Sequence, residues 1–486
     1  MGPGRLLSGT LPTYNNGGKS SYLGGRNAKG QLLAYQILPL IAAWLIFLVL
    51  ERQEWFRKWG MILIFAGGAF LQIALWWRST PSLLNPDSFG FYLLSKGMEH
   101  DLRALLYRPK LYPLFLGLFP TLQAAAFAQC LLKLLSGMFI LRMSRILELR
   151  PATTGLVLCV YLINSLWLQE PLQIMDTTVF TFLFTACFWM AAETVAEPSL
   201  WRFTALCLTA ALTSLTRQVG DLSLALVITL VIWTMIAAGK SKVGLLFPIL
   251  LAAVLAMAGA FDNYLHNGVF KRTVALGVNL YTHASEYALS DPKSPEWDFV
   301  ETHLPDARAQ TGKWNPDYRQ AISWSVNALP HRLERALGSH NQAEILAANK
   351  TLTDRSIRWA RKNPRSYLAS IRNEASRLLW KCEEYYPQSL LGKVIPIPTW
   401  ALRLERGIIH QPLWLLFGLG GLAILIGRGK RMTLVIFFLG PASYVLLIAS
   451  IQLGFTRYAL PILPTLLILS GHALDRVTAW ISPPTA

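Results

Sequence analysis

Charged residues are scarce in this chain of 486 residues: they make up 15% of it, whereas a soluble domain carries about a quarter. Hydrophobic residues make up 53%, and the mean hydropathy is +0.38. A helix needs about 20 apolar residues to cross a bilayer core of ~30 Å. Apolar stretches of that length recur along the chain, separated by short basic loops, which predicts a polytopic membrane protein.

Cysteine is also scarce, and its five positions show neither a disulfide framework nor metal-ligand spacing. Residues 1–31 are polar and rich in glycine, and they lack the apolar core of a cleavable signal peptide. We find no P-loop, HExxH, GxSxG or dinucleotide fingerprint, which disfavours the common soluble enzyme classes. The eight histidines are scattered, so no metal site is predicted.

Acidic residues are outnumbered, and the formal net charge is +18. Nucleic acid is one class of partner for such a charge, but the chain has no basic low-complexity arm and no nucleic-acid-binding motif. Basic cytoplasmic loops and anionic lipid headgroups explain the excess better. We therefore expect membrane lipids, and no nucleic acid, as partners.

The distribution of polar residues divides the chain into four predicted parts. Residues 1–31 form a flexible tail, and residues 32–263 form a transmembrane module with a long outer loop at 78–112. Residues 264–408 form a mostly helical, water-exposed domain, and residues 409–486 return to transmembrane helices. The predicted fold is an all-α polytopic membrane protein.

The number of spanning helices is about ten or eleven. The first run, 33–50, either spans the membrane or lies in its interface, and both readings stay open. The remaining apolar runs are at about 60–77, 121–141, 151–167, 177–196, 201–217, 220–238, 244–263, 410–427, 432–450 and 458–475.

The loops between these runs predict an orientation. If every run spans, the short basic loops all fall on one side, which should be cytoplasmic. The 78–112 loop and the 264–408 domain then share the opposite side. The basic positions are Arg52, Arg57, Lys58, Arg142, Arg145, Arg150, Arg202, Lys240, Lys242, Arg428, Lys430, Arg431 and Arg476.

Two acidic residues at membrane ends on the non-cytoplasmic side are candidate site residues. Asp87 lies in NPDSFGFY of the outer loop, and Asp176 lies in LQIMDTTVFTF at the start of a spanning run. A carboxylate at the edge of a membrane cavity can act as a general base on an acceptor hydroxyl. Both residues are also suited to capping a helix N-terminus, which is the structural alternative.

Three arginines lie on that same predicted side: Arg108, Arg217 and Arg457. Arginine suits bidentate phosphate binding, so together they predict a site for a lipid phosphate or pyrophosphate. The alternative is that they are snorkelling anchors at helix ends.

Six short motifs in this order resemble the GT-C superfamily of polyprenyl-phosphate-dependent glycosyltransferases, especially its protein mannosyltransferase and aminoarabinose transferase branch. The resemblance extends from about residue 60 to 475. The motifs are NPDSFGFYLLSKG, YRPKLYPLFLGLF, QIMDTTVFTFLF, LTSLTRQVGDLSLAL, WARKNPRSYLASIRNEASRLLW and TRYALPILPTLLILSG.

The resemblance implies Asp87 as catalytic base and Asp176 as a second acidic group of the site. It places Arg217 and Arg457 near the lipid-phosphate donor. Arg108 and Tyr112, and likewise Tyr458, belong to the matching motifs and complete the predicted donor-binding set.

The chain also departs from the family pattern. Ser88 follows Asp87 where many members carry a second acid, and Gln218 stands where proline is common. Run 33–50 is additional. These departures leave the subfamily and the acceptor open.

The expected function is transfer of a sugar from a polyprenyl-phosphate-linked donor to a lipid, glycan or protein acceptor on the non-cytoplasmic side. The implied location is a bacterial inner membrane with the active face periplasmic. No cofactor is required, and a divalent metal is optional. A non-catalytic transporter or flippase, and a lipid-pyrophosphate-using enzyme similar to an O-antigen ligase, are the alternatives.

Overall fold

The computed structural model describes residues 43–79, 81, 86–98, 102–163, 168–289, 291, 293–307, 329–338, 341–380, 413–426, 430–451, 458 and 460–481. Within these ranges the regular elements are helices. The predicted tail at 1–31 and the first part of run 33–50 lie outside the described residues.

Six helices of the described ranges are long and apolar enough to cross a membrane. They are α2 (Glu54–Arg78), α6 (Leu122–Ile146), α9 (Thr177–Ala196), α11 (Asp221–Ala237) with the 3-10 turn η2 (Gln218–Gly220), α12 (Lys242–Ala256) with α13 (Ala258–Asn267), and α23 (Arg431–Ile451). Shorter apolar helices are α7 (Pro151–Ile163), α10 (Leu200–Thr216) and α22 (Leu413–Ile426), and α24 (Leu463–Ile481) is the last helix. The described helices are compatible with a membrane protein, and the total of ten or eleven spans stays a prediction.

Several helices begin where short hydroxyl side chains cap them. The hydroxyls of Thr121, Ser199 and Ser241 accept hydrogen bonds from backbone N–H groups in the first turns of α6, α10 and α12. Such caps satisfy donors that a helix start leaves unpaired. The apolar run therefore sets each helix's length, and the cap sets where it begins.

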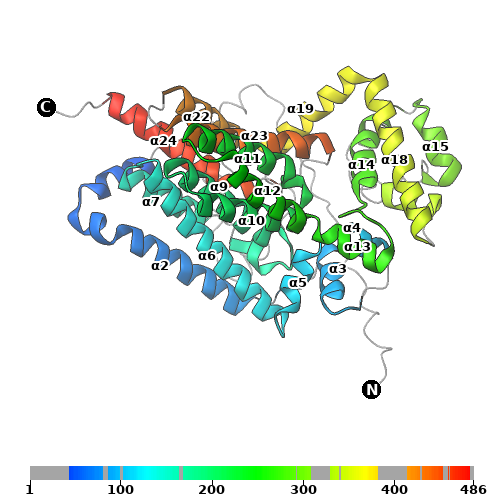
Figure 1. The fold of residues 1–486 in the computed structure, drawn as a ribbon, viewed down its shortest axis with the longest axis horizontal. Helices are drawn as coiled ribbons and strands as arrows, with labels where there is room; N and C mark the ends of the chain where they lie inside the picture. The colour runs from blue at the N-terminus through cyan, green and yellow to red at the C-terminus, as the bar shows by residue number, and fades with distance from the viewer. Residues whose placement is uncertain are drawn as a thin grey trace, which may run out of the picture.

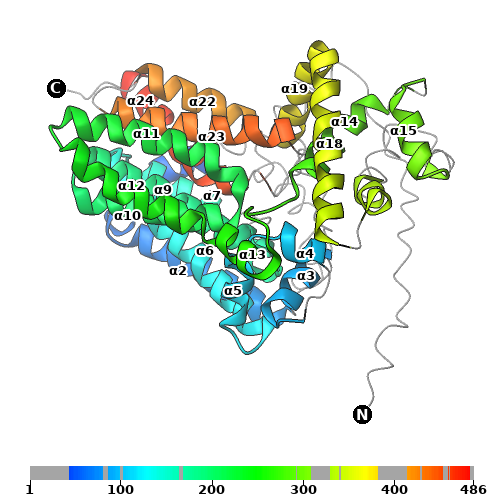
Figure 2. The ribbon, with the colours of Figure 1, turned by 45° about the vertical axis from the view of Figure 1, so that its right-hand side comes forward.

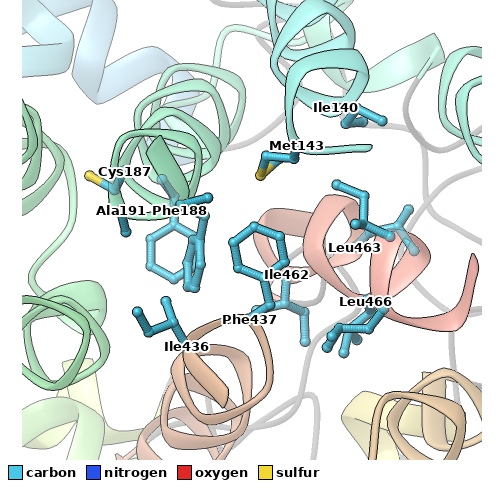
Figure 3. Packing of buried hydrophobic residues seen from close by; sticks show 14 of the residues in the cluster. Ile140, Met143, Cys187, Phe188, Ala191, Ile436, Phe437, Ile462, Leu463 and Leu466 are labelled. Atoms are coloured by element: carbon cyan, nitrogen blue, oxygen red, sulfur yellow. The ribbon is translucent and has the colours of Figure 1, made fainter. Parts of the chain in front are cut away.

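Helix α9 lies at the centre of the bundle and is the most buried of the six long apolar helices. Its buried side chains pack against α6, α23 and the start of α24, as Figure 3 shows for Phe188 and Phe437. Helices α2 and α12 are the least buried and carry exposed large apolar residues such as Phe70 and Phe247. Their outer faces are the surface that lipid would cover.

The predicted cytoplasmic loops meet at one end of the bundle. Arg150 pairs with Glu51 at 2.9 Å, and Lys430 pairs with Glu148 at 3.2 Å. The Arg150 backbone N–H donates to Asp475 at 2.7 Å. Three loops that are far apart in sequence therefore lie near one another, and the side of the membrane that they face stays a prediction.

The outer loop 78–112 holds short helices and contacts the region after α13. Its helices are α3 (Pro86–Ser95) and α4 (Leu102–Tyr107), and α5 (Leu111–Gly117) follows. The backbone N–H of Val274 donates to the carbonyl of Leu106 at 3.1 Å, and Lys110 pairs with Asp262 at 3.4 Å. The two polar regions of the chain thus lie at the same end of the bundle.

The polar domain stands beside the apolar bundle (Figures 1 and 2). Its described helices include α14 (Leu276–Ala288), α15 (Glu296–His303), α18 (Gln342–Lys362) and α19 (Pro364–Trp380). A separate apolar cluster around the fully buried Trp297 forms its core. Gly277 allows α14 to touch α18, because a Cβ there would collide with the carbonyl of Asn349. Helix α19 returns to the bundle, where the Tyr367 hydroxyl donates to the Ser450 carbonyl.

Candidate functional site

Asp176 stands directly before α9, at the end of the bundle that carries the polar regions. Its carboxylate makes no capping hydrogen bond to α9, all of whose residues the structure describes. Asp176 therefore occupies the N-cap position of α9, as the helix-cap alternative expects, but its side chain does not make the capping hydrogen bond. The side chain is 7% exposed, and such a buried carboxylate needs a partner.

That partner is Arg217, at the end of α10. Its Nε donates to Oδ2 of Asp176 at 2.8 Å, and its Nη2 donates to Oδ1. Nη2 also donates to the Thr177 hydroxyl at 2.8 Å. The Arg217 side chain is 9% exposed. A bidentate pair of this kind fixes the plane of the guanidinium as well as its position.

Aromatic rings enclose the guanidinium. The Cζ atom of Arg217 lies 5.7 Å from the ring centroid of Phe180 and 5.4 Å from that of Tyr458. Phe180 in turn stacks on Tyr444 of α23 at 6.1 Å. These contacts stabilise the cation and shield it from water. The predicted site residues Arg217 and Tyr458 therefore lie together.

One edge of this cluster has unused hydrogen-bonding capacity. Among the described residues, Nη1 of Arg217 and the Tyr444 hydroxyl form no hydrogen bond of good geometry, although the Tyr444 hydroxyl lies close to the Arg217 side chain. Both atoms are buried. Buried polar groups in proteins are nearly always paired, so these two groups are available to each other or to a ligand.

The helix that carries Asp87 lies against the segment before Asp176. Asp87 belongs to the first turn of α3, although its side chain lies outside the described residues. The next residue, Ser88, is buried, and its hydroxyl contacts the sulfur of Met175 at 3.2 Å. The sequence segments of the two acidic candidates are therefore neighbours.

Tyr112 is fully buried, and its hydroxyl donates to Gln129 of α6 at 3.0 Å. The Gln129 amide donates to the carbonyls of Pro171 and Gln173, in the loop that leads to Asp176. Burial, with the nearby negative carboxylates, raises the pKa of Tyr112 well above its usual range. The phenol stays protonated and braces this loop.

Arg108 lies beside α3. Its guanidinium carbon is 5.5 Å from the Phe91 ring centroid, and a Cβ at Gly90 would collide with the guanidinium. Phe91 contacts the Tyr112 ring edge-on at 5.0 Å. Arg108 therefore belongs to the same end of the bundle as Asp176, on the α3 side. Arg457 lies outside the described residues.

Two polar clusters were not foreseen from the sequence. Arg272 pairs with Asp221, the first residue of α11, close to Arg217. Lys133 is buried inside α6, where it donates to Gln72 at 2.8 Å and to the Leu162 carbonyl at 3.1 Å. Asp221 lies in the LTSLTRQVGDLSLAL motif, and this was the only feature of the sequence that could have identified it as a site residue.

No group of three His, Cys, Asp or Glu side chains that could hold a metal ion occurs in the part of the chain that the structure describes. The described side chains of the site are a cation, a carboxylate, hydroxyls and aromatic rings. No protein-family model matches the chain, and no curated protein matches it. Function has to be argued from the site itself.

Proposed function

We propose that the protein is an integral-membrane glycosyltransferase of the GT-C type, which transfers a sugar from a polyprenyl-phosphate-linked donor to an acceptor. The observation that supports this most is the buried pair of Asp176 and Arg217. It holds a cation at a membrane end and leaves one guanidinium nitrogen for a ligand. The helix carrying Asp87 lies beside it.

Arg217 is proposed to bind the phosphate of the donor. Asp176 and Thr177 use two of its nitrogens, so Nη1 is the nitrogen left to donate. The Tyr444 hydroxyl is a second donor for the same phosphate. Preorganised donors of this kind stabilise the charge that develops on a leaving group, and they act strongly where water is excluded.

Asp87 is the proposed general base. It takes the proton of the acceptor hydroxyl while the acceptor oxygen forms a bond to the anomeric carbon. The bond between that carbon and the phosphate oxygen breaks, and its electron pair leaves with the polyprenyl phosphate. No covalent enzyme intermediate is needed. Tyr112 supports the site by bracing the loop before Asp176.

The arrangement of the helices supports a lipid-linked donor. The site lies at the end of apolar helices, and α2 and α12 leave apolar faces uncovered for lipid. The basic loops gather at the opposite end. By the positive-inside rule the site faces away from the cytoplasm, which in a bacterial inner membrane is the periplasmic side.

Lys133 favours a second function, a transporter or flippase. An ionisable side chain within a spanning helix is costly and often lines a transport pathway. Lys133 and Gln72 form such a polar contact between α6 and α2. A lipid-pyrophosphate-using ligase is a third proposal and differs in its donor.

The deciding experiment offers purified protein a panel of short-chain polyprenyl-phosphate and polyprenyl-pyrophosphate sugars. We expect release of polyprenyl phosphate from a monophosphate donor, and loss of release in Asp87→Asn with normal expression and folding. Asp298→Asn, at an exposed position of α15, is the matched control. Full activity of Asp87→Asn would eliminate that residue as the base. Movement of the lipid across vesicle membranes without release of sugar would support the transporter instead of the enzyme.

A further inference from the structure

The segment that joins α13 to the polar domain crosses the turn that holds Arg217. We call residues 269–274 the strap. The side-chain amide of Asn263, in α13, donates to the strap carbonyls of Lys271 at 2.7 Å and Arg272 at 3.2 Å. The strap backbone is therefore fastened to the end of a candidate spanning helix.

Arg272 of the strap contacts both ends of the turn. Its Nη1 donates to the hydroxyl of Ser214, in the last turn of α10, and its Nη2 donates to the carboxylate of Asp221. Between these contacts, the Thr273 hydroxyl donates to the side chain of Gln218 at 3.0 Å. The turn that begins at Arg217 is therefore clamped at both ends and in the middle.

From these contacts we propose that Arg272 is a positioning residue for Arg217. By clamping Ser214 to Asp221, it holds the turn in the conformation in which Nη1 of Arg217 meets the donor phosphate. This inference depends on the proposed function and adds to it a residue from outside the α9–α11 group.

The backbone at the turn gives such a clamp something to hold. Arg217 leaves α10 in an extended conformation, with φ −153° and ψ 125°, and the three residues of η2 follow before α11 begins. A short 3-10 turn has poor hydrogen-bond geometry of its own. A binding group has to be held to within about 0.5 Å of its productive position. Asp176 holds the guanidinium itself, and the clamp holds the backbone that carries it.

The strap also reaches the loop that carries the proposed base. The backbone N–H of Val274 donates to the carbonyl of Leu106, in α4 of the outer loop. One short segment thus contacts both the turn of Arg217 and the loop that contains Asp87. The strap therefore connects the turn of Arg217 to the outer loop through backbone as well as side-chain contacts.

The clamp can be tested without unfolding the protein. The side chains of Arg272 and Asp221 are 26% and 32% exposed, so water can reach either group when its partner is removed. The test measures binding of a short-chain polyprenyl phosphate, without sugar, to the purified full-length protein. Hydrogen exchange of residues 213–221 is followed in parallel. Lys271→Gln, at the exposed neighbouring position, is the matched control.

We expect Arg272→Gln to weaken binding about tenfold and to speed exchange at 213–221, with a melting temperature close to that of the wild type. Asp221→Asn should behave in the same way. The charge swap Asp221→Arg with Arg272→Asp should restore most of the affinity, because it restores the clamp. Lys271→Gln should bind as the wild type does.

The outcomes separate the two proposals. If the wild type binds the lipid phosphate and Arg272→Gln binds it equally well, the clamp is refuted and the proposed function stands. If the charge swap stays as weak as the single variants, Arg272 does not act through Asp221, and the positioning role is refuted. If the wild type does not bind the lipid phosphate, the proposed function fails. Unchanged exchange in Arg272→Gln would then refute the clamp independently.

Discussion

Replacing Arg217 by glutamine should damage both stability and ligand binding, and the two effects can be separated. The substitution leaves the carboxylate of Asp176 buried without its cation. Removing one partner of a buried pair costs about 3–5 kcal/mol, because the remaining charge is uncompensated. The double variant Asp176→Asn with Arg217→Gln removes both charges. It should therefore unfold at a higher temperature than Arg217→Gln alone.

The ligand-binding effect follows from the unused nitrogen. A hydrogen bond to a charged group contributes roughly 1.5–3 kcal/mol, which corresponds to about 10- to 100-fold in affinity. Arg217→Gln and the double variant should both lose that much affinity for a short-chain polyprenyl phosphate. Asp176→Asn keeps the Arg217 cation and should lose less affinity for the lipid phosphate. The double variant is the informative one, since its stability is partly restored while its binding is not.

Isothermal titration of the lipid phosphate into each variant, with thermal melting of the same samples, checks both effects. Wild-type affinity in the double variant would refute the assignment of Arg217 to the phosphate. If the stability loss of the double variant equals the sum of the losses in the two single variants, Asp176 and Arg217 do not act as a coupled pair.

The remaining predictions concern orientation, the loop brace, the polar domain and the buried lysine. In a Cys382→Ser background, a membrane-impermeant thiol reagent applied to intact cells should label Lys271→Cys and spare Lys240→Cys, because these two exposed positions lie on opposite sides of the proposed membrane. Equal labelling of the two variants would contradict the orientation. Tyr112→Phe should lower the melting temperature, since Gln129 loses a donor worth about 1 kcal/mol, and it should lower lipid-phosphate affinity less than Arg217→Gln does, because Tyr112 only braces the loop before Asp176. Burial and the Glu296 carboxylate raise the pKa of Tyr281 well above its usual range. The contribution of this tyrosine to stability is therefore complete below about pH 10, where an unfolded tyrosine ionises, and is lost as the pH rises further. Between pH 9 and pH 11, the melting temperature of Tyr281→Phe should fall less than that of the wild type. Lys133→Met should lower the melting temperature, because it leaves the Gln72 side chain and the Leu162 carbonyl without their donor; unchanged transfer activity in this variant would weaken the transporter alternative.

Helix positions were largely predictable, because an apolar run is a local property of the sequence. The run expected at 177–196 coincides with α9, and the run at 432–450 differs from α23 by one residue at each end. The run at 244–263 was read as one helix, whereas the chain divides into α12 and α13 around Met257. A hydropathy window averages over such a break.

Partnerships across the chain were not predictable. Asp176 fits a helix cap by residue type and position, and only the structure shows that its side chain pairs instead with Arg217, 41 positions later. Arg272 and Asp221 are 51 positions apart, and no local pattern links them. Lys133 was missed because one lysine barely lowers the hydropathy of a long apolar run.

The central place of α9 has a consequence for how the protein is made. Asp176 and Arg217 belong to neighbouring helices and emerge early, so their charges can neutralise each other as soon as α10 is inserted. Tyr444 and Tyr458, which complete the enclosure of the guanidinium, come from the last helices. At about 5–20 residues per second, synthesis of the chain between Arg217 and Tyr458 takes roughly 10 to 50 s. During that interval the nascent chain carries a neutralised pair without its aromatic cover. Each molecule therefore acquires its proposed lipid-binding site only at the end of synthesis.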